Sequence, residues 1–285
     1  VEVINCKAVK FQISGSCPSA SVDKTTSCNI CLMSEAAKAM QLSTSKHSNV
    51  QVTYTNGDDP VEKSVPEQFV HTIREDGTLE SKASPTVSSL DAGGADPAGG
   101  AGGGAGEEEE AEASPESAEE AGTAPDPRAK FEDSNRSWTV EGVEGGQPVT
   151  IRVQEKHDTV LLYKCKNATV QIQGKVDSVS IDSCVKTQVV MDRVISSVEV
   201  INSKSIKFQI SGSCPAAIID NTDGCNAFLL SEKAKRIQLS TSIHSDVQLT
   251  FMKGEDCVEK PVPEQFVHSI EKDGSLVSKV STLYS

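Results

Sequence analysis

Pairs of aliphatic residues recur about every 19 positions in the second half of the chain. Each pair has the pattern apolar–any–apolar, which is the alternation of a strand with one buried face. One series consists of Val160, Val179, Val198 and Ala217, followed two residues later by Leu162, Ile181, Val200 and Ile219. A single repeat of this size cannot bury its own apolar face, so the series predicts short strands that stack as successive coils.

A second series runs half a coil away from the first. It consists of Ile151, Val170, Val189 and Phe208, followed by Val153, Ile172, Met191 and Ile210. One insertion moves the next coil to Ile237 and Leu239. Two strands per coil of about 19 residues predict an all-β fold, a parallel β-helix. The outward positions are then Arg152, Gln171, Val190 and Gln209 on one sheet, and Leu161, Ser180, Glu199 and Ile218 on the other.

Part of this repeat occurs twice. Residues 1–88 align without a gap to residues 198–285, and well over half of the paired positions are identical. A Gly-, Ala- and Glu-rich segment without periodicity separates the two copies, which is typical of a linker that buries no core. We therefore predict a partial unit at 1–88, a disordered linker at 89–128 and a complete unit at 129–285. The first copy begins at a coil boundary, so we expect a truncated chain or a segment that stacks on this end.

Both copies end with the sequence VPEQFVH followed by a short hairpin. In the second copy, Asp273-Gly274 lies between two alternating segments, a signal for a type I′ hairpin turn. Such a hairpin has edges that need partners, on its own coils or on another copy. The residues that we expect in this pairing are Pro263, Phe266, Val267, Ile270, Leu276 and Val277.

Charge and cysteine content exclude several classes of partner. The net charge is -14 and the pI is near 4.8, which argues against nucleic acid or an anionic membrane. No apolar run approaches the roughly 18 residues that a membrane span requires. Nine cysteines, an odd number outside any compact disulfide framework, favour reduced thiols and a cytoplasmic location.

The motifs that suggest chemistry also have structural interpretations. Cys28 and Cys31 have the spacing of a zinc half-site, but Phe228 replaces Cys31 in the other copy, so we expect packing rather than metal binding. Cys165, Cys184 and Ser203 share one register and predict a column of small residues at a corner. The histidine pairs His47/His244 and His71/His268 belong to no metal or nucleophile motif. We expect no cofactor and no catalytic residue.

An ordered set of motifs resembles a known family. The segments LLYKCKNATVQIQGKVDSVSIDSC, VEVINSKSIKFQISG, IIDNTDGCNAFLL and PVPEQF closely resemble the C-terminal CARP domain of cyclase-associated proteins. The likeness covers 129–285 in full and its second half again over 1–88. It implies a right-handed parallel β-helix that dimerises by exchanging the C-terminal hairpin. The helical domain, proline-rich segment and WH2 motif of that family are absent from this sequence.

The resemblance also implies a function and partners. Members of the family bind monomeric actin, preferably with ADP, and promote exchange of ADP for ATP in cooperation with cofilin; adenylyl cyclase is a further implied partner. Since actin is acidic, we expect outward basic residues to contact it. These residues are Arg152, Lys164, Lys166, Lys175, Lys186, Lys204 and Lys207. The duplication raises the hypothesis that the usual homodimer is replaced by an intramolecular pseudo-dimer.

Two other functions stay open at this point. The β-helix of tubulin cofactor C is a relative by fold that supplies an arginine to a GTPase, and the candidate here is Arg193. That family's neighbouring glutamines are missing around Arg193. The second alternative is a structural dimerisation module without a client protein.

Overall fold

The computed structural model describes residues 1–56, 59–84, 126–271 and 275–281, and these residues are almost entirely β-structure. The shorter part contains β1 (Glu2–Ile4), β2 (Lys7–Ile13), β3 (Ser19–Asp23), β4 (Thr26–Leu32), α1 (Glu35–Lys38), β5 (Gln41–Ser45), β6 (Ser48–Asn56), β7 (Asp59–Ser64), β8 (Phe69–Ile73) and β9 (Leu79–Ala83). The longer part contains β10 (Ala129–Glu132), β11 (Ser137–Glu141), β12 (Val149–Arg152), β13 (Thr159–Tyr163), β14 (Thr169–Asp182), β15 (Gln188–Ile201), β16 (Lys204–Ile210), β17 (Ala216–Leu229), the 3-10 helix η2 (Ala234–Arg236), β18 (Gln238–Lys253), β19 (Asp256–Pro261), β20 (Gln265–Ile270) and β21 (Leu276–Val280).

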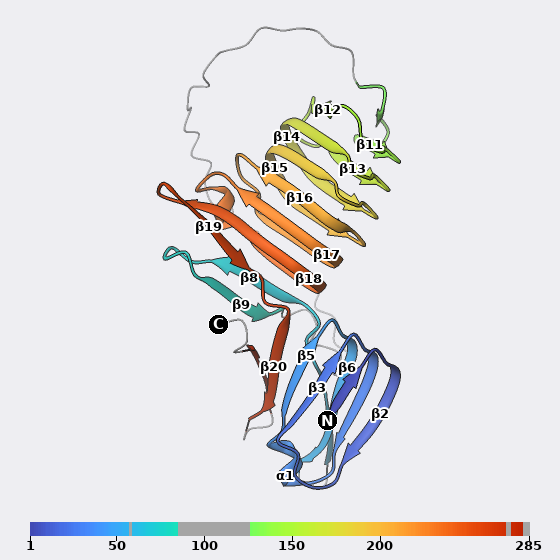
Figure 1. The fold of residues 1–285 in the computed structure, drawn as a ribbon, viewed down its shortest axis with the longest axis vertical. Helices are drawn as coiled ribbons and strands as arrows, with labels where there is room; N and C mark the ends of the chain where they lie inside the picture. The colour runs from blue at the N-terminus through green and yellow to red at the C-terminus, as the bar shows by residue number, and fades with distance from the viewer. Residues whose placement is uncertain (57–58, 85–125, 272–274, 282–285) are drawn as a thin grey trace, which may run out of the picture.

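The longer part is a parallel β-helix, as the 19-residue repeat predicts. Its strands stack in the order β11, β13, β14, β15, β17 and β18 on one face (Figure 1). The two predicted columns that start at Val160 and Leu162 are confirmed as far as Ala217 and Ile219, and their side chains are buried. This stacking gives each coil the apolar partner that it lacks alone. None of the helices in the described ranges is long and apolar enough to cross a membrane.

The prediction for the first coil was wrong by two residues. Val149 pairs with Val170 and Ile151 with Ile172, so Val153 is not a member of the inner column. The reason is a longer corner: nine positions separate Ile151 from Val160, whereas seven separate Ile172 from Val179. Arg152 consequently lies beside Gln173, not in the row of Gln171.

The later coil also differs from its expected register. Leu239 pairs with Ala217 and Thr241 with Ile219, so the inward pair is Leu239 and Thr241 instead of Ile237 and Leu239. The insertion contains η2, which adds three residues to the 19-residue spacing. Ile237 is buried at the end of η2, and this explains its apolar character.

A ladder of small side chains closes one corner of the β-helix. The backbone N–H of Cys165 donates to Cys184 Sγ at 3.4 Å, and that of Cys184 donates to Ser203 Oγ at 3.1 Å. Ser203 continues the ladder to Thr222 Oγ1 at 3.4 Å. The predicted corner column is therefore confirmed. On either side of the ladder the chain turns through residues with positive φ, such as Lys164 (53°) and Asn167 (49°).

A buried carboxylate holds the first coil together. Asp158 Oδ1 accepts hydrogen bonds from Arg136 Nε and Nη2 at 2.9 and 2.5 Å, and Oδ2 accepts from Trp138 Nε1 at 3.4 Å. Burial raises the pKa of this carboxyl, but the bonds from Arg136, two backbone N–H groups and Trp138 outweigh it and lower the pKa below its usual value. Asp158 thus stays charged while it ties the long corner to β11.

The shorter part is a smaller β-helix with a core of its own. Its two faces are the parallel series β1–β3–β5 and β2–β4–β6, and β7 closes the second face in antiparallel orientation. The core includes Val22, Ile30, Leu42 and Val52. It repeats the register of residues 198–261, as the duplication predicts.

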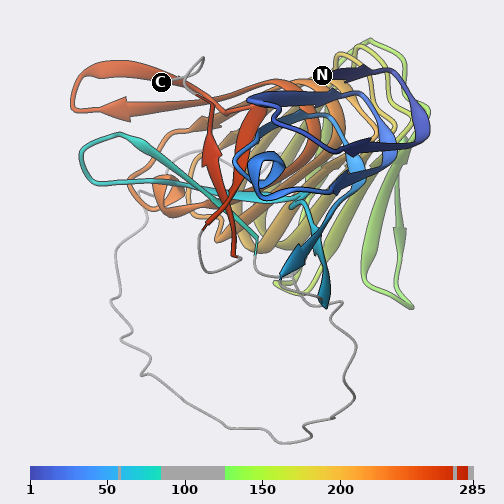
Figure 2. The same cartoon turned by 90° about the horizontal axis from the view of Figure 1, so that it is seen from below.

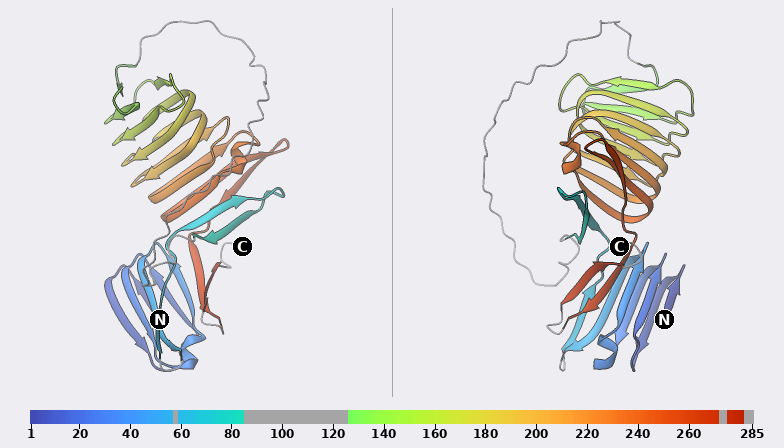
Figure 3. Two further views of the ribbon diagram at one scale, coloured as in Figure 1. Left: turned by 180° about the vertical axis from the view of Figure 1, so that it is seen from behind. Right: turned by 60° about the vertical axis from the view of Figure 1, so that its left-hand side comes forward.

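The two C-terminal hairpins cross between the two β-helices. β8 of the shorter part pairs antiparallel with β18 of the longer part, where Leu239 lies opposite His71. β20 pairs in the same way with β5, where His268 lies opposite Leu42. Each hairpin therefore covers the last coil of the other β-helix, as the views in Figures 1 and 3 show. Seen from below in Figure 2, the shorter β-helix lies across the end of the longer one.

The predicted type I′ turn at Asp273-Gly274 lies outside the described residues. Its counterpart, Asp76-Gly77, differs from the expectation for such a turn. Gly77 has a φ of 81°, but neither Glu75 nor Asp76 has positive φ, and Gly77 N–H donates to Arg74 O at 2.9 Å. A turn followed by one glycine in the left-handed region fits a longer loop than the two-residue type I′ turn.

We expect Ile181→Ala to destabilise the longer β-helix by about 2–5 kcal/mol, because Ile181 is fully buried and its removal leaves a cavity. Urea unfolding followed by circular dichroism measures the change. Ser180→Ala is the matched control, since Ser180 is the neighbouring outward residue, and it should change stability by less than about 0.5 kcal/mol. Equal losses for both variants would contradict the assigned register.

Candidate functional site

The outer surface of the second face is a mixed polar and apolar wall. The register places Gln171, Val190, Gln209 and Phe228 in one outward row across four neighbouring strands. Val190 and Phe228 are half-buried, and together with Lys207 they border a shallow hollow of about 230 Å³. A half-buried aromatic side chain among polar groups is typical of protein-binding surfaces.

The sequence pattern did not predict that Phe228 would form part of a binding surface. Its equivalent in the shorter copy is Cys31, and the comparison of the copies indicated only a packed position. The register with Gln209 is the signal that identifies it as outward. The opposite face shows Leu161, Ser180, Glu199 and Ile218 in one outward row, as predicted.

All seven basic residues expected to contact a partner are exposed, but the structure divides them into two groups. Around the corner ladder lie Lys164, Lys166, Lys186 and Lys204, with Lys207 at the adjoining edge of the wall. At the opposite edge lie Arg152 and Lys175, where Lys175 pairs in register with Arg193. We call the first five residues the basic corner.

Acidic and aromatic neighbours engage part of the basic corner. Lys166 Nζ lies 3.2 Å from Glu144 Oε1, and Lys204 Nζ lies 3.2 Å from Asp223 Oδ2. Lys164 Nζ lies 4.7 Å from the ring centre of Tyr163. Exposed pairs of this kind contribute little to stability, so these ammonium groups can exchange their partners for those of a bound protein.

The motifs with possible metal chemistry have packing roles in the described residues. Cys28 points inward with Ile30, whereas Cys31 lies on the other side of the same strand, so the two thiols do not converge on one ion. No cluster of three or more His, Cys, Asp or Glu residues suited to a metal occurs in the described ranges. His157 lies in the loop between β12 and β13.

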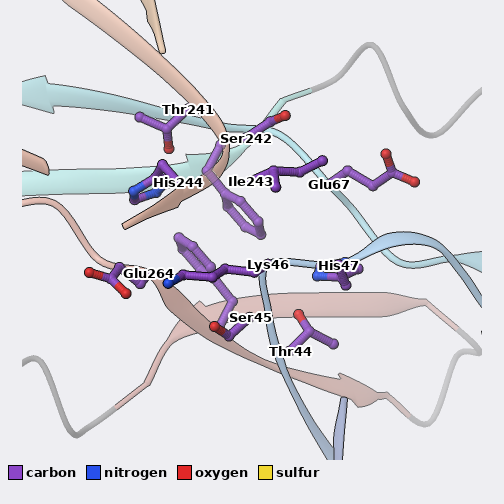
Figure 4. Close-up of a pocket in the computed structure, with 12 residues that line it drawn as sticks. Thr44, Ser45, Lys46, His47, Glu67, Thr241, Ser242, Ile243, His244 and Glu264 are labelled. Carbon is purple, nitrogen blue, oxygen red and sulfur yellow. The ribbon is translucent and has the colours of Figure 1, made fainter. Parts of the chain in front are cut away.

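The junction between the two β-helices is the second candidate site (Figure 4). Phe69 and Phe266, one from each hairpin, stack with ring centres 3.4 Å apart and planes 5° apart. The rings border a small space of about 20 Å³. Of the predicted pairing residues, Pro263 and Phe266 are buried, and Ile270 and Leu276 pack against the core of the shorter β-helix. Val267 lies opposite Ser43, and Val277 pairs with Ser269.

Hydrogen bonds between the copies surround the stacked rings. His71 Nε2 lies 2.8 Å from Thr241 Oγ1, and His268 Nε2 lies 2.7 Å from Thr44 Oγ1. The two contacts are equivalent under the duplication, so each hairpin histidine reaches a threonine of the opposite β-helix. The junction is therefore specific and nearly symmetric.

We expect Phe69→Ala and Phe266→Ala each to destabilise the junction by about 3–5 kcal/mol, because each ring is buried against the other. The double variant should lose less than the sum by about 0.5–1.5 kcal/mol, since either single change already removes the stacking contact. A double-mutant cycle from urea unfolding measures this coupling. Strictly additive losses would show that the two rings do not interact.

Comparison with known proteins agrees with this architecture. The family described as "Adenylate cyclase associated (CAP) C terminal" matches residues 1–86 and 126–283. Human adenylyl cyclase-associated protein 1 is 36% identical over 139 residues, which cover 48% of this chain and 29% of the human protein. Rat adenylyl cyclase-associated protein 2 is 34% identical over 131 residues, covering 46% of this chain and 27% of that protein.

A solved structure shares the fold. The cyclase-associated protein from Cryptosporidium parvum has a TM-score of 0.51 and 27% identity, with 56% of this chain and 98% of that chain covered. The chain thus spans less than a third of the length of the curated relatives that it matches. The family match, which extends over both β-helices, shows that this chain belongs to the family of C-terminal domains of adenylate cyclase-associated proteins.

Proposed function

We propose that this protein binds monomeric actin, with a preference for the ADP-bound form, and accelerates exchange of ADP for ATP. The observation that carries the proposal is the family match over both β-helices, because resemblance to this family implies this activity. The protein is not itself an enzyme in this proposal, and cofilin-bound actin and adenylyl cyclase are further proposed partners.

The basic corner and the adjoining wall support an acidic protein as the client. Five ammonium groups lie along one edge of the longer β-helix, and Val190 and Phe228 offer apolar contact beside them. Complementary charge orients a partner and accelerates association, while a buried aromatic contact supplies affinity. Arg152 and Lys175 lie at the far edge of the same wall and extend the proposed contact across it.

The proposed mechanism is differential binding. A protein that binds more tightly to actin with an opened nucleotide cleft increases the population of that form and so raises the rate of ADP release. The wall needs only rigidity for this role, and the hydrogen-bonded stacking of its coils provides it. The alternative in which Arg193 activates a GTPase stays a prediction; Arg193 is exposed beside Lys175 at the corner opposite the basic corner.

We expect Lys204→Glu combined with Lys207→Glu to slow the stimulated release of a fluorescent ADP analogue from actin monomers by about 10-fold or more, because two attractive contacts become repulsive. Stopped-flow fluorescence measures the rate. The chain offers a matched control, Lys7→Glu with Lys10→Glu, at the equivalent positions of the shorter β-helix. That control should stay within about twofold of the parent.

The outcomes separate the possibilities. An equal loss in both variants would place the contact on both β-helices. An unchanged rate in both would exclude the basic corner as the contact, and no stimulation by the parent protein would overturn the proposed exchange activity. Phe228→Ser tests the apolar part of the wall in the same assay, and we expect it to slow the stimulated rate as well.

We further propose that the two copies of one chain form the dimer-like unit within that chain. From β11 to β8 the longer β-helix has six strand-to-strand steps, which span about 29 Å at about 4.8 Å each. The 41 residues from 85 to 125 can reach at most about 140 Å. Since the connection is long enough, pairing within the chain competes effectively with pairing between chains.

We expect deletion of residues 88–121 to convert a monomer into a dimer of chains. Seven connecting residues would remain, with a reach of at most about 25 Å, so the hairpins could no longer cross within one chain. Light scattering coupled to gel filtration at low micromolar concentration measures the mass, against 30.2 kDa for the parent. Deletion of residues 95–106 alone leaves ample length and should give a monomer. A parent protein that is already dimeric at this concentration would contradict the proposal.

A further inference from the structure

Four buried histidines surround the junction between the two β-helices. They are His47 and His244, each in the last coil of its own β-helix, and His71 and His268, each on a hairpin that crosses to the other. Their exposed fractions are 6%, 6%, 0% and 1%. Protein cores seldom bury so many titratable groups at one contact, which makes their protonation state important for the junction.

The surroundings of the hairpin histidines contain hydroxyl groups but no acidic partner. His71 lies between Thr241 Oγ1 at 2.8 Å and Ser81 Oγ at 2.7 Å. His268 lies between Thr44 Oγ1 at 2.7 Å and Ser278 Oγ at 2.8 Å. Hydroxyls serve as donor or acceptor, so a neutral imidazole is fully satisfied in either tautomer. The stacked rings of Phe69 and Phe266 lie on the remaining side.

The other two histidines are less well satisfied. His47 Nε2 and His244 Nδ1 are buried without a hydrogen-bond partner in the described residues. A proton on either atom would therefore be buried without a hydrogen-bond acceptor, which is costly. The same small space of about 20 Å³ is bordered by both residues, and Figure 4 shows them on either side of the junction.

Charged groups around the junction do not compensate a proton there. Lys46 borders the same space and lowers the pKa of His244 by repulsion, after the larger effect of burial. Glu67 and Glu264 also border it, where they accept backbone N–H groups from Asn49 and Asp246, and neither carboxylate raises the pKa of His47 or His244. None of the four histidines forms an ion pair with an acidic side chain in the described ranges.

We propose that the junction is a proton-sensitive latch: the exchanged hairpins hold the two β-helices together only while these four histidines are neutral, and mild acid releases the hairpins. Each β-helix keeps its own stacked core in the released state. The inference concerns how the two copies are held together and does not depend on actin binding.

The direction follows from linkage. Burial lowers the pKa of His71 and His268 to about 3, and that of His47 and His244 to about 4, whereas a solvated imidazole has a pKa near 6.5. Above pH 6.5 both states are neutral, and the junction has its full stability. Below pH 6.5 the open state binds protons that the closed state does not bind, so stability is lost progressively down to about pH 3, where His71 and His268 also become protonated in the closed state.

The expected size is large because the effects multiply. At pH 5.5 each histidine freed by opening favours the open state by about 10-fold. Release of the two hairpin histidines therefore shifts the equilibrium by about 100-fold, and exposure of all four shifts it by about 10⁴-fold. The pH of 5.5 that produces this shift lies within the mildly acidic range of cellular pH.

Hydrogen exchange by mass spectrometry of the full chain at pH 7.4 and 5.5 tests the latch, with rates corrected for the intrinsic effect of pH. We expect peptides of β8 and β20 to lose protection by about 100- to 10⁴-fold at pH 5.5, while β14 and β15 keep theirs. Unchanged protection in β8 and β20 would overturn the proposal. An equal loss in β14 and β15 would also overturn it, because that result means global unfolding.

Matched variants assign the effect to the junction. His71→Gln with His268→Gln keeps neutral hydrogen-bonding side chains on the hairpins. This double variant should reduce the loss of protection at pH 5.5 by about 100-fold. His47→Gln with His244→Gln should reduce the loss by a similar factor when these residues are also exposed on opening. His157→Gln, in an exposed loop, should change nothing. If both double variants kept the full pH dependence of protection in β8 and β20, the latch would be overturned. Loss of this protection at pH 7.4 in both double variants would also overturn it, because neutral side chains at these positions would then not hold the hairpins.

Discussion

The stacking of one coil on the next is the constraint on which the whole structure depends. Each strand bonds to the strand of the neighbouring coil, so every interior coil has both edges satisfied, but the last coil of each β-helix has an open edge. β18 and β5 are these last coils on the first face, and the exchanged strands β8 and β20 cover them. The hairpin exchange is thus the structural consequence of ending a β-helix.

This geometry also explains why the junction is chemically unusual. The corner ladder that runs through Cys165, Cys184, Ser203 and Thr222 reaches His244 at the last coil, since Thr222 pairs with His244. The side chain at each inner rung accepts a hydrogen bond from the backbone N–H of the preceding coil. The imidazole of His244 occupies the last rung, where the other β-helix takes the place of a further coil, and its Nδ1 has no hydrogen-bond partner among the described residues.

Much of the fold could be predicted from the sequence because the repeat is strict. The columns that start at Val160 and Leu162 identified the inward faces of the strands. Spacing alone also located the corner column of Cys165 and the C-terminal hairpin. Spacing failed where a corner changes length, at Ile151 before Asp158 and at Leu239 after η2. The junction histidines and Phe228 could be located but not interpreted, because their neighbours come from other coils or from the other copy. The assignment of the basic corner to a partner stays a proposal.

One chain that carries both halves of a paired structure differs genetically from two identical chains. In a homodimer every substitution appears on both sides, so a change that helps one side must be tolerated by the other. Here the two sides are encoded by separate codons. Lys46 and Ile243 occupy equivalent corners of the two copies, in the left-handed region at φ values of 47° and 45°, and both border the junction. A β-branched residue is poorly suited to that conformation, and it occurs on one side only. Fusion therefore lets each half specialise independently, which a symmetric pair cannot do.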